Sequence, residues 1–156
     1  NLATQILDVS KEYGVMLATA ESCTGGMVAA ALTDIPGSSA VVERGFVTYT
    51  NRAKIEMLGV SEATLDAYGA VSEEVAREMA SGALTHAPVD LTVSITGIAG
   101  PGGSEHKPEG RVCFGVADAQ GVVTETVEFG ALGREAVRRA ARDHALELLL
   151  KRLKGL

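Results

Sequence analysis

Residues 15–32 read VMLATAESCTGGMVAAAL, and this stretch decides the fold. The first half is short and apolar, which is typical of a buried strand, and the Ala-rich residues from Cys23 or Thr24 onward predict a helix. A strand that turns directly into a helix points free helix N–H groups at the turn, so a hydroxyl there lies beside a ready oxyanion site. Ser22 is therefore the first candidate nucleophile. The alternative, favoured on the turn alone, is that Ser22 or Thr24 only caps the helix, because caps far outnumber nucleophiles.

The remaining chain alternates between helical and strand-like patterns. Apolar spacing and caps predict helices at residues 2–13, 51–58, 61–67, from Ser72 through Ala83, and at 133–154. Residues rich in Val, Phe and Tyr predict strands at 40–50 and 90–96, and an antiparallel hairpin at 111–117 and 122–129. No internal repeat and no linker is visible. This order predicts a single α/β domain over residues 1–156, a three-layer α/β/α sandwich around a mixed β-sheet.

Composition narrows the class of protein to which the chain belongs. The net charge of −6 and the absence of Trp argue against general binding to nucleic acid or anionic membranes, and no apolar run is long enough to cross a membrane. Cys23 and Cys113 show no pairing motif, so a reducing cytoplasm is the expected location. His86, His106 and His144 lack metal-ligand spacing, so we expect no metal site.

Positive charge is concentrated near the end of the chain, where seven of the 14 Lys and Arg residues fall at Arg134 or later. They lie on the helix predicted at 133–154, in which Glu135–Arg139 and Glu147–Lys151 are i,i+4 pairs in the favourable order. This pattern favours a solvated helix face as the explanation for much of the basic cluster.

Three polar or Gly-rich segments follow predicted strands: Ser22–Gly26, Thr48–Lys54 and Thr96–Gly103. Ligands of open α/β sheets gather at the carboxyl ends of the strands, so these segments would line one cleft rich in hydroxyl and backbone N–H groups. Such a cleft suits a phosphorylated small molecule. The Gly-rich run matches neither the Walker A pattern nor GxGxxG in a dinucleotide-binding unit.

Each candidate in this cleft has a plainer alternative. Lys54 on a short helix is more often an exposed charge than a base, and Tyr49 at a strand end more often has its hydroxyl in water. Cys23 is a second candidate nucleophile, although no His lies in a recognisable partner position. The residues alone leave these alternatives open.

Five motifs occur together and in order, and they carry a resemblance to a known family. They are Ala20-Glu-Ser-Cys-Thr-Gly-Gly26, Pro36-Gly-Ser-Ser39, Val47-Thr-Tyr-Thr-Asn51 with Lys54, Gly69-Ala-Val-Ser72 and Thr96-Gly-Ile-Ala-Gly-Pro-Gly-Gly103. Through them the chain resembles, over essentially its whole length, the C-terminal domain of the competence/damage-inducible protein CinA. This is the nicotinamide-nucleotide amidohydrolase family, whose free-standing members are called PncC.

The resemblance implies hydrolysis of the carboxamide of nicotinamide mononucleotide to nicotinate mononucleotide and ammonia, without a metal or other cofactor. It also implies a catalytic serine, tyrosine and lysine, which fall on Ser22, Tyr49 and Lys54. The phosphate is expected against the Gly-rich loop, Thr96 or a Ser-Ser pair, with Arg52 as a further counter-charge. From motif membership, the substrate-binding residues would be Cys23, Thr24, Gly25, Ser38, Ser39, Arg52, Thr96, Gly97, Gly100 and Gly102.

A catalytic set of this kind makes chemical sense without a histidine. A serine hydroxyl needs a base at neutral pH, and a lysine whose pKa is lowered by burial can serve as that base. Lys54 follows Tyr49 by five residues, so both side chains can project to one side, where Tyr49 would relay a proton or orient the amine. The backbone N–H groups of Cys23 to Gly25 would hold the oxyanion.

The leading interpretation is an amidohydrolase that binds nicotinamide mononucleotide and forms a homodimer, with no nucleic-acid or membrane partner. The runner-up is a nucleotide-binding or regulatory module of the same fold without turnover. A third interpretation is an amidase with another substrate. DNA binding is disfavoured because the chain is acidic.

Overall fold

A central sheet of five strands organises the molecule. The computed structural model describes residues 1–155, and its strands lie in the order β2-β1-β3-β4-β5. β1 pairs in parallel with β2 and β3, whereas the β3–β4 and β4–β5 pairs are antiparallel, so the sheet is mixed. The strands are β1 (Leu17–Glu21), β2 (Val42–Val47), β3 (Leu91–Gly97), β4 (Arg111–Asp118) and β5 (Gly121–Glu128).

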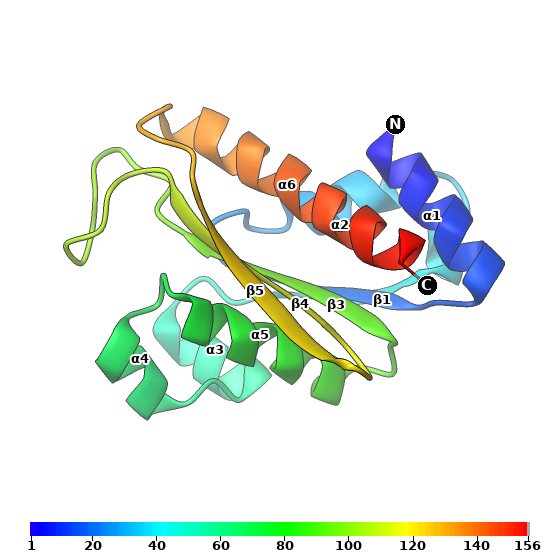
Figure 1. Ribbon diagram of the computed structural model, residues 1–156, viewed down its shortest axis with the longest axis horizontal. Coiled ribbons are helices and arrows are strands. Elements are labelled where there is room, and N and C mark those ends of the chain that lie inside the picture. The colour runs from blue at the N-terminus through cyan, green and yellow to red at the C-terminus, as the bar shows by residue number, and fades with distance from the viewer. Residues whose placement is uncertain (156) are drawn as a thin grey trace.

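Helices cover both faces of this sheet (Figure 1). One layer holds α1 (Leu2–Tyr13), α2 (Met27–Thr33) and α6 (Arg134–Lys154), and the other holds α3 (Asn51–Leu58), α4 (Glu62–Tyr68) and α5 (Glu73–His86). A short 3-10 turn, η1 (Ser38–Ala40), precedes β2. The three-layer α/β/α sandwich that the sequence predicts is confirmed.

β1 is buried along its whole length because both helical layers pack against it. Successive side chains of a strand point to opposite faces, so β1 contributes to two apolar clusters. Leu17 joins the cluster that includes Phe114 on the side of α1, α2 and α6. Ala18 and Ala20 join the cluster around Met79 of α5. The strand that precedes Ser22 is thus held from both sides.

Local capping residues set most helix boundaries where the sequence predicts them. Thr50, Ser61 and Ser72 each accept a hydrogen bond from the backbone N–H three residues ahead, and so begin α3, α4 and α5. Gly14 (φ 67°) ends α1 and Gly59 (φ 71°) ends α3 in the left-handed conformation that glycine adopts at little cost. These contacts are local, which is why the sequence pattern could identify them.

Buried hydroxyl groups on β3 fix α5 against the sheet. Thr92 Oγ1 donates to the carbonyl oxygen of Ala80 (2.7 Å), and Ser94 Oγ donates to that of Ala76 (2.6 Å). Each bond satisfies a polar group that would otherwise be buried without a partner. Together they set the position of α5, and with it the segment before α5 that reaches the carboxyl end of β3.

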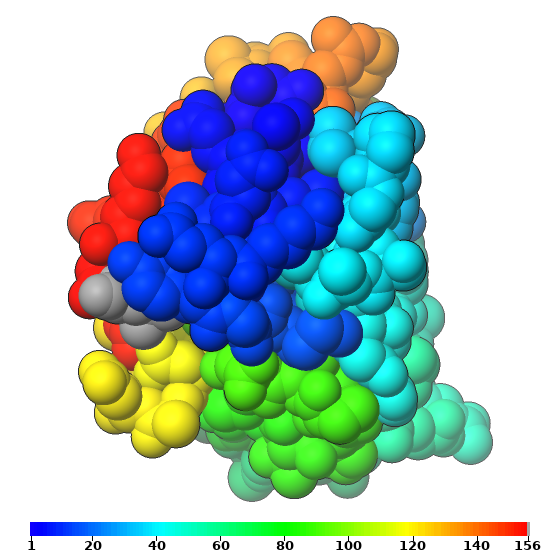
Figure 2. Space-filling model, turned by 90° about the vertical axis from the view of Figure 1, so that its right-hand side faces the viewer, coloured from blue at the N-terminus to red at the C-terminus, as the bar shows by residue number. Residues whose placement is uncertain are grey.

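The parallel strands β1, β2 and β3 end at the same edge of the sheet. The segments at 22–26, 48–54 and 98–110 follow them, and the start of α6 reaches the same edge, at the left of Figure 1. The opposite edge carries the turn before β2, where the blue α1 and the cyan segment around η1 lie side by side (Figure 2). A ligand at the carboxyl ends of the strands therefore meets the first set of segments and not η1.

Candidate active site

Ser22 and Lys54 meet at the base of a cleft although 32 residues separate them in the chain. Lys54 Nζ lies 3.2 Å from Ser22 Oγ. Ser22 directly follows β1 and is 8% exposed, whereas Lys54, in the first turn of α3, is 1% exposed. Lys54 is therefore not the exposed surface charge that a short helix would suggest. The structure places an amine within hydrogen-bond distance of the candidate nucleophile.

Burial controls the protonation of the Lys54 amine. Its Nζ also donates to the carbonyl oxygens of Thr48 (3.1 Å) and Tyr49 (3.3 Å), in the loop between β2 and α3. Burial removes the water that would stabilise an ammonium ion, and so lowers the pKa of Lys54 below its ordinary value. A larger fraction of the amine is then neutral and able to accept the proton of Ser22.

Cys23, the alternative nucleophile, is not activated. Its side chain is 5% exposed, and burial raises the pKa of the Cys23 thiol to about 12. A thiol with this pKa stays protonated at neutral pH, and only the thiolate is strongly nucleophilic. Ser22 is the better candidate of the two because its hydroxyl contacts a base.

The carboxylate of Glu21 occupies the N-terminus of α2. Its Oε1 accepts hydrogen bonds from the backbone N–H groups of Gly26 (3.2 Å) and Val28 (2.9 Å), and its Oε2 accepts one from Ala29 (3.0 Å). The side chain is completely buried. Negative charge at a helix N-terminus is favourable, so Glu21 ties the last residue of β1 to the first turn of α2. The turn that carries Ser22 is held between these two points.

This arrangement corrects three expectations from the sequence. α2 begins at Met27 rather than at Cys23 or Thr24, because the two glycines of the turn have positive φ (57° and 108°) and delay the helix. Neither Ser22 nor Thr24 caps α2. The helix N–H groups that were expected to be free for an anion are taken by Glu21.

Replacing the buried carboxylate tests its structural role. Glu21→Ala should lower the free energy of unfolding by about 3 kcal/mol, because three buried N–H groups lose their acceptor. Turnover should fall as well, because the turn that orients Ser22 loses an anchor. Urea unfolding measures the first effect. Glu12→Ala, on an exposed position of α1, is the control and should change stability by less than about 0.5 kcal/mol. An equally stable Glu21→Ala protein would contradict this role.

The backbone N–H groups near Ser22 differ in whether they already donate a hydrogen bond within the protein. Gly25 N donates to the carbonyl oxygen of Ser22 (2.9 Å), so it does not hold an oxyanion in this conformation. Cys23 N and Thr24 N make no backbone hydrogen bond within residues 1–155. Arg138 of α6 donates to the carbonyl oxygens of Cys23 (3.0 Å) and Thr24 (3.4 Å) and so fixes both peptide groups. Of these two residues, Cys23 lines the cleft, and an N–H group beside a nucleophile is suited to stabilise an oxyanion.

A cleft of about 360 Å³ opens above Ser22 and Lys54. Its walls come from the turn after β1, the start of α3, the segment before α5, the Gly-rich loop after β3 and the start of α6. The strand-end segments therefore line one cleft, as the sequence predicts. Five of the expected substrate-binding residues line it: Cys23, Thr96, Gly97, Gly100 and Gly102.

Thr96, Thr24 and Gly25 of that set have structural contacts of their own. Thr96 lines the cleft, but its hydroxyl donates to the carbonyl oxygen of Ala70 (2.8 Å) and so joins two walls. Thr24 is completely buried, and Gly25 packs against the guanidinium of Arg138. Thr24 and Gly25 lie behind the cleft wall, where they support the turn that carries the nucleophile.

Ser38, Ser39 and Arg52 do not reach this cleft. Ser38 and Ser39 belong to η1, which precedes β2 and so lies at the amino end of that strand. Arg52 has an 85% exposed side chain that pairs with Glu56 (2.7 Å). Because the first turn of α3 directs Lys54 inward, Arg52 points away from the interior. The expectation that these three residues contact the same substrate finds no support in this chain's fold.

Tyr49 lies at the mouth of the cleft. Its hydroxyl accepts a hydrogen bond from Arg134 Nη2 (2.5 Å), and the residue is 56% exposed. It precedes α3, so helical spacing does not relate Tyr49 to Lys54 as the sequence reasoning assumed. The contact between these two residues runs through the Tyr49 carbonyl oxygen. Within residues 1–155, the Tyr49 hydroxyl is bonded to Arg134 and makes no hydrogen bond to the Lys54 amine.

Arg134 and Arg138 lie on the helix whose basic residues the sequence pattern explained largely as a solvated face, but Arg134 lines the cleft and Arg138 contacts the turn after β1. Arg134 Nη1 donates to the carbonyl oxygen of Gly100 (2.7 Å), which joins the start of α6 to the Gly-rich loop. Their i,i+4 spacing places both arginines on one side of α6. Neither arginine belongs to the i,i+4 acid–base pairs that explain the exposed face. This lack of an acidic partner at that spacing was the sequence signal that could have identified them.

The Gly-rich loop is held in place by Glu109. Its Oε1 accepts from Gly102 N (2.7 Å) and its Oε2 accepts from Gly133 N (2.9 Å), at the start of α6. Gly100 has φ 92°, and a Cβ there would lie 2.5 Å from the carboxyl carbon of Glu109. The loop therefore requires a glycine at this position because of a close approach within the protein.

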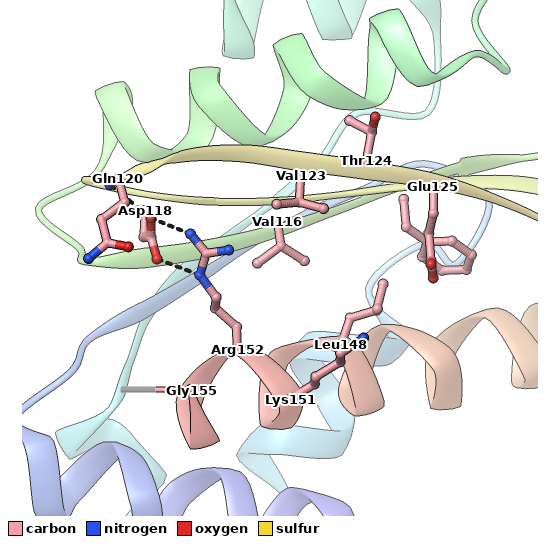
Figure 3. A pocket seen from close by; sticks show the side chains of 11 residues that line it. Val116, Asp118, Gln120, Val123, Thr124, Glu125, Leu148, Lys151, Arg152 and Gly155 are labelled. Atoms are coloured by element: carbon pink, nitrogen blue, oxygen red, sulfur yellow. Dashed lines mark hydrogen bonds and ion pairs between the residues drawn. The ribbon is translucent and has the colours of Figure 1, made fainter.

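A larger hollow of about 660 Å³ lies elsewhere, between the end of α6 and the β4–β5 hairpin (Figure 3). Arg152 crosses it to form two 2.7 Å hydrogen bonds with Asp118, and Val123 and Leu148 line its apolar part. Among residues 1–155, no serine or cysteine lines this hollow. The chemistry described above therefore belongs to the smaller cleft.

Neither a metal-binding cluster nor a membrane-spanning helix is present among residues 1–155. Within residues 1–155, no three His, Cys, Asp or Glu side chains gather in a group that could hold a metal ion. In the same range, no helix combines the length and the apolarity that crossing a membrane requires.

Comparison with known proteins gives the family. A family model described as the CinA C-terminal domain matches residues 1–153. The chain belongs to the CinA C-terminal domain family. A member from Escherichia coli, named nicotinamide-nucleotide amidohydrolase PncC, is 54% identical over 149 residues, which are 95% of this chain and 90% of that protein. A CinA-like protein from Chloroherpeton thalassium is 51% identical over 95% of this chain, but over 37% of its own length.

Solved structures of the CinA superfamily share the fold. The competence/damage inducible protein CihA from Agrobacterium tumefaciens matches with a TM-score of 0.94 at 49% identity, over 98% of this chain and 93% of that one. A CinA superfamily protein from Klebsiella pneumoniae matches with a TM-score of 0.95 at 36% identity, over 99% and 97% of the two chains. The resemblance stated from the sequence motifs is confirmed at the level of the family.

Proposed function

We propose that the protein hydrolyses the carboxamide of nicotinamide mononucleotide to nicotinate mononucleotide and ammonia. The observation that carries this proposal is the 3.2 Å contact between Ser22 Oγ and a buried Lys54 amine at the base of a cleft. A relative that covers 95% of this chain is named a nicotinamide-nucleotide amidohydrolase. In this proposal the Ser22 hydroxyl acts as the nucleophile, the Lys54 amine as the base and the Cys23 N–H as the oxyanion donor, which are the groups that amide hydrolysis needs.

The first half of the reaction forms an ester on Ser22. The neutral Lys54 amine takes the hydroxyl proton while Oγ attacks the carboxamide carbon, and the C–O bond forms as the C=O bond becomes an oxyanion. The backbone N–H group of Cys23, a residue that lines the cleft, stabilises this oxyanion. The C–N bond then breaks, and the nitrogen leaves as ammonia with the proton that Lys54 accepted.

The second half returns the enzyme to its starting state. A water molecule loses a proton to the neutral Lys54 amine and attacks the ester carbon, which again generates an oxyanion. The ester bond breaks, Ser22 Oγ regains the proton from Lys54, and nicotinate mononucleotide leaves. In this proposal Tyr49, whose hydroxyl accepts a hydrogen bond from Arg134, donates a hydrogen bond to the departing nitrogen or to the substrate.

Arg134 is the proposed ligand for the substrate's phosphate. It is the arginine that lines the cleft, and its guanidinium lies between Tyr49 and the Gly-rich loop. The N-terminus of α2 cannot bind the phosphate because Glu21 already occupies it. A guanidinium can bind phosphate through two parallel hydrogen bonds.

Arg134→Met should raise KM for nicotinamide mononucleotide on the order of 10-fold to 100-fold, because a charge-assisted contact to the substrate is lost. The variant should also lose the preference for this nucleotide over nicotinamide riboside, which lacks the phosphate. Steady-state ammonia release with both substrates measures this. Arg139→Met, at an exposed position of the same helix that does not line the cleft, is the control. A retained preference for the phosphorylated substrate would exclude Arg134 as the phosphate ligand.

One assay tests the proposed reaction itself. Incubation with nicotinamide mononucleotide should release ammonia and nicotinate mononucleotide in equal amounts. Thermal stabilisation by the nucleotide without ammonia would instead favour a binding module of the same fold. Free nicotinamide and NAD as competitors distinguish an amidase with another substrate. A homodimer and a cytoplasmic location stay predictions.

A further inference from the structure

The far wall of the cleft carries a strained two-residue turn. Ser104 N donates to Lys107 O (3.0 Å) and Lys107 N donates to Ser104 O (2.8 Å), and the two residues between them have positive φ, 52° at Glu105 and 63° at His106. Such turns are usually built from Asn and Gly, because a Cβ clashes with the backbone in this conformation. Strained residues of this kind persist where surrounding contacts hold them, and they cluster at functional sites.

The turn is anchored to the segment before α5. Lys107 Nζ donates to the carbonyl oxygens of Tyr68 (2.7 Å) and Val71 (2.6 Å). These contacts bring Glu105 over Gly69, where an added Cβ would lie only 2.5 Å from Glu105 Oε2. Because Gly69 carries no side chain, the carboxylate can lie against its backbone. The turn that carries Glu105 is positioned by the two hydrogen bonds of Lys107.

Glu105 is a carboxylate without a partner in this cleft. It is the one acidic residue among those that line the cleft within the described chain, and it is exposed. No hydrogen bond or ion pair to its side chain is formed by any residue from 1 to 155. The cations that line the same cleft, Lys54 and Arg134, are bonded to other groups. The cleft thus presents one acceptor group that makes no hydrogen bond or ion pair within residues 1–155, although its charge acts to raise the pKa of Lys54 against the larger effect of burial.

We propose that the Glu105 carboxylate binds the vicinal ribose hydroxyls of the nucleotide and so selects a ribosylated amide over a free one. This inference rests on the proposed function. An ionised carboxylate accepts hydrogen bonds through two oxygens, which matches two adjacent hydroxyl groups, and an acidic side chain recognises ribose hydroxyls in dinucleotide-binding folds. In the substrate the ribose joins the pyridine ring to the phosphate. With the carboxamide at Ser22 and the phosphate at Arg134, the ribose therefore faces the wall that carries Glu105.

Binding is measured in a Ser22→Ala background, in which turnover does not consume the ligand. Glu105→Gly should raise the Kd for nicotinamide mononucleotide on the order of 10-fold to 100-fold by isothermal titration calorimetry. The Kd for the 2′,3′-dideoxy analogue should be the same with and without the substitution. Glu12→Gln, on the exposed part of α1, removes one negative charge far from the cleft and should leave both Kd values unchanged.

Glu105→Gly should also stabilise the free protein, although it weakens binding of the nucleotide. Glycine adopts positive φ without a Cβ penalty, so Glu105→Gly should raise the melting temperature of the free protein by about 3 °C while it weakens binding. If Glu105 had only a structural role, its substitution would not weaken binding and raise stability together. A melting temperature that falls would contradict the strained turn, and with it the proposal.

The outcomes separate this inference from the proposed reaction. An unchanged Kd for the nucleotide in Glu105→Gly would overturn the proposal, as would an equal loss of affinity for the dideoxy analogue, because the carboxylate would then act on the pyridinium charge. Failure of the Ser22→Ala protein to bind the nucleotide at all would overturn it too. Absence of ammonia from the wild-type protein, with Glu105-dependent binding intact, would refute only the proposed reaction.

Discussion

Ser22→Ala should lower the rate of ammonia release from nicotinamide mononucleotide by at least about 1,000-fold. The hydroxyl is the atom that forms the bond to the carboxamide carbon in the proposed reaction, so no remaining group can form the ester intermediate. Binding of the substrate should change little, because the N–H groups and the cationic walls of the cleft are kept. Single-turnover ammonia release and calorimetric titration measure the two effects separately.

Ser81→Ala is the matched control for this prediction. Ser81 is a partly buried serine in the middle of α5, outside the cleft, and its substitution should leave the rate within about twofold. A Ser22→Ala protein that deamidates at the parent rate would rule out the nucleophile role. Activity would then require direct attack by water, or attack by the thiol of Cys23.

Lys54→Met should lower kcat on the order of 100-fold to 10,000-fold and leave KM nearly unchanged. Methionine fills the buried space of the side chain but cannot accept a proton, so the loss appears in the chemical step. Steady-state kinetics over a pH series measures it. Lys151→Met on an exposed position of α6 is the control, with unchanged kcat. A variant that raises KM with kcat intact would make Lys54 a ligand of the phosphate instead.

The same substitution should change how stability depends on pH. The pKa of Lys54 is lowered in the folded protein by burial, so between that pKa and the unfolded value the unfolded chain binds more protons. Stability contributed by this group therefore rises with pH across that window, and it is reduced at lower pH, where folding requires the loss of the proton or the burial of a charge. Lys54→Met should remove this slope in urea unfolding measured at alkaline pH.

Local signals explain why much of the fold could be predicted. Thr50, Ser61 and Ser72 act as caps through hydrogen bonds three residues away, and Gly14 and Gly59 end helices by their own conformation. Contacts of this range are contained in a short stretch of sequence. The gathering of three strand-end segments follows from a parallel pairing that apolar runs also indicate.

The parts that could not be predicted depend on contacts between distant segments or on chain direction. Glu21 shows only as an acidic residue within an apolar strand, and its role appears when α2 packs beside β1. Arg134 reaches Tyr49 across 85 residues of sequence. The expectation that Ser38 and Ser39 contact the substrate could have been rejected from the sequence. They precede a parallel strand, and such a segment lies at the edge opposite to one that follows a strand.

The pH titration of the Lys54 amine tests the central claim most directly. We expect nitrogen-15 spectroscopy of labelled lysine to give a midpoint for Lys54 below the usual lysine value of about 10.4, while the Lys54→Met spectrum lacks this signal. The wild-type kcat/KM for nicotinamide mononucleotide should rise with pH through that same midpoint, because the neutral amine is the active form. A Lys54 midpoint at or above the usual value, with kcat/KM already constant at neutral pH, would contradict the account.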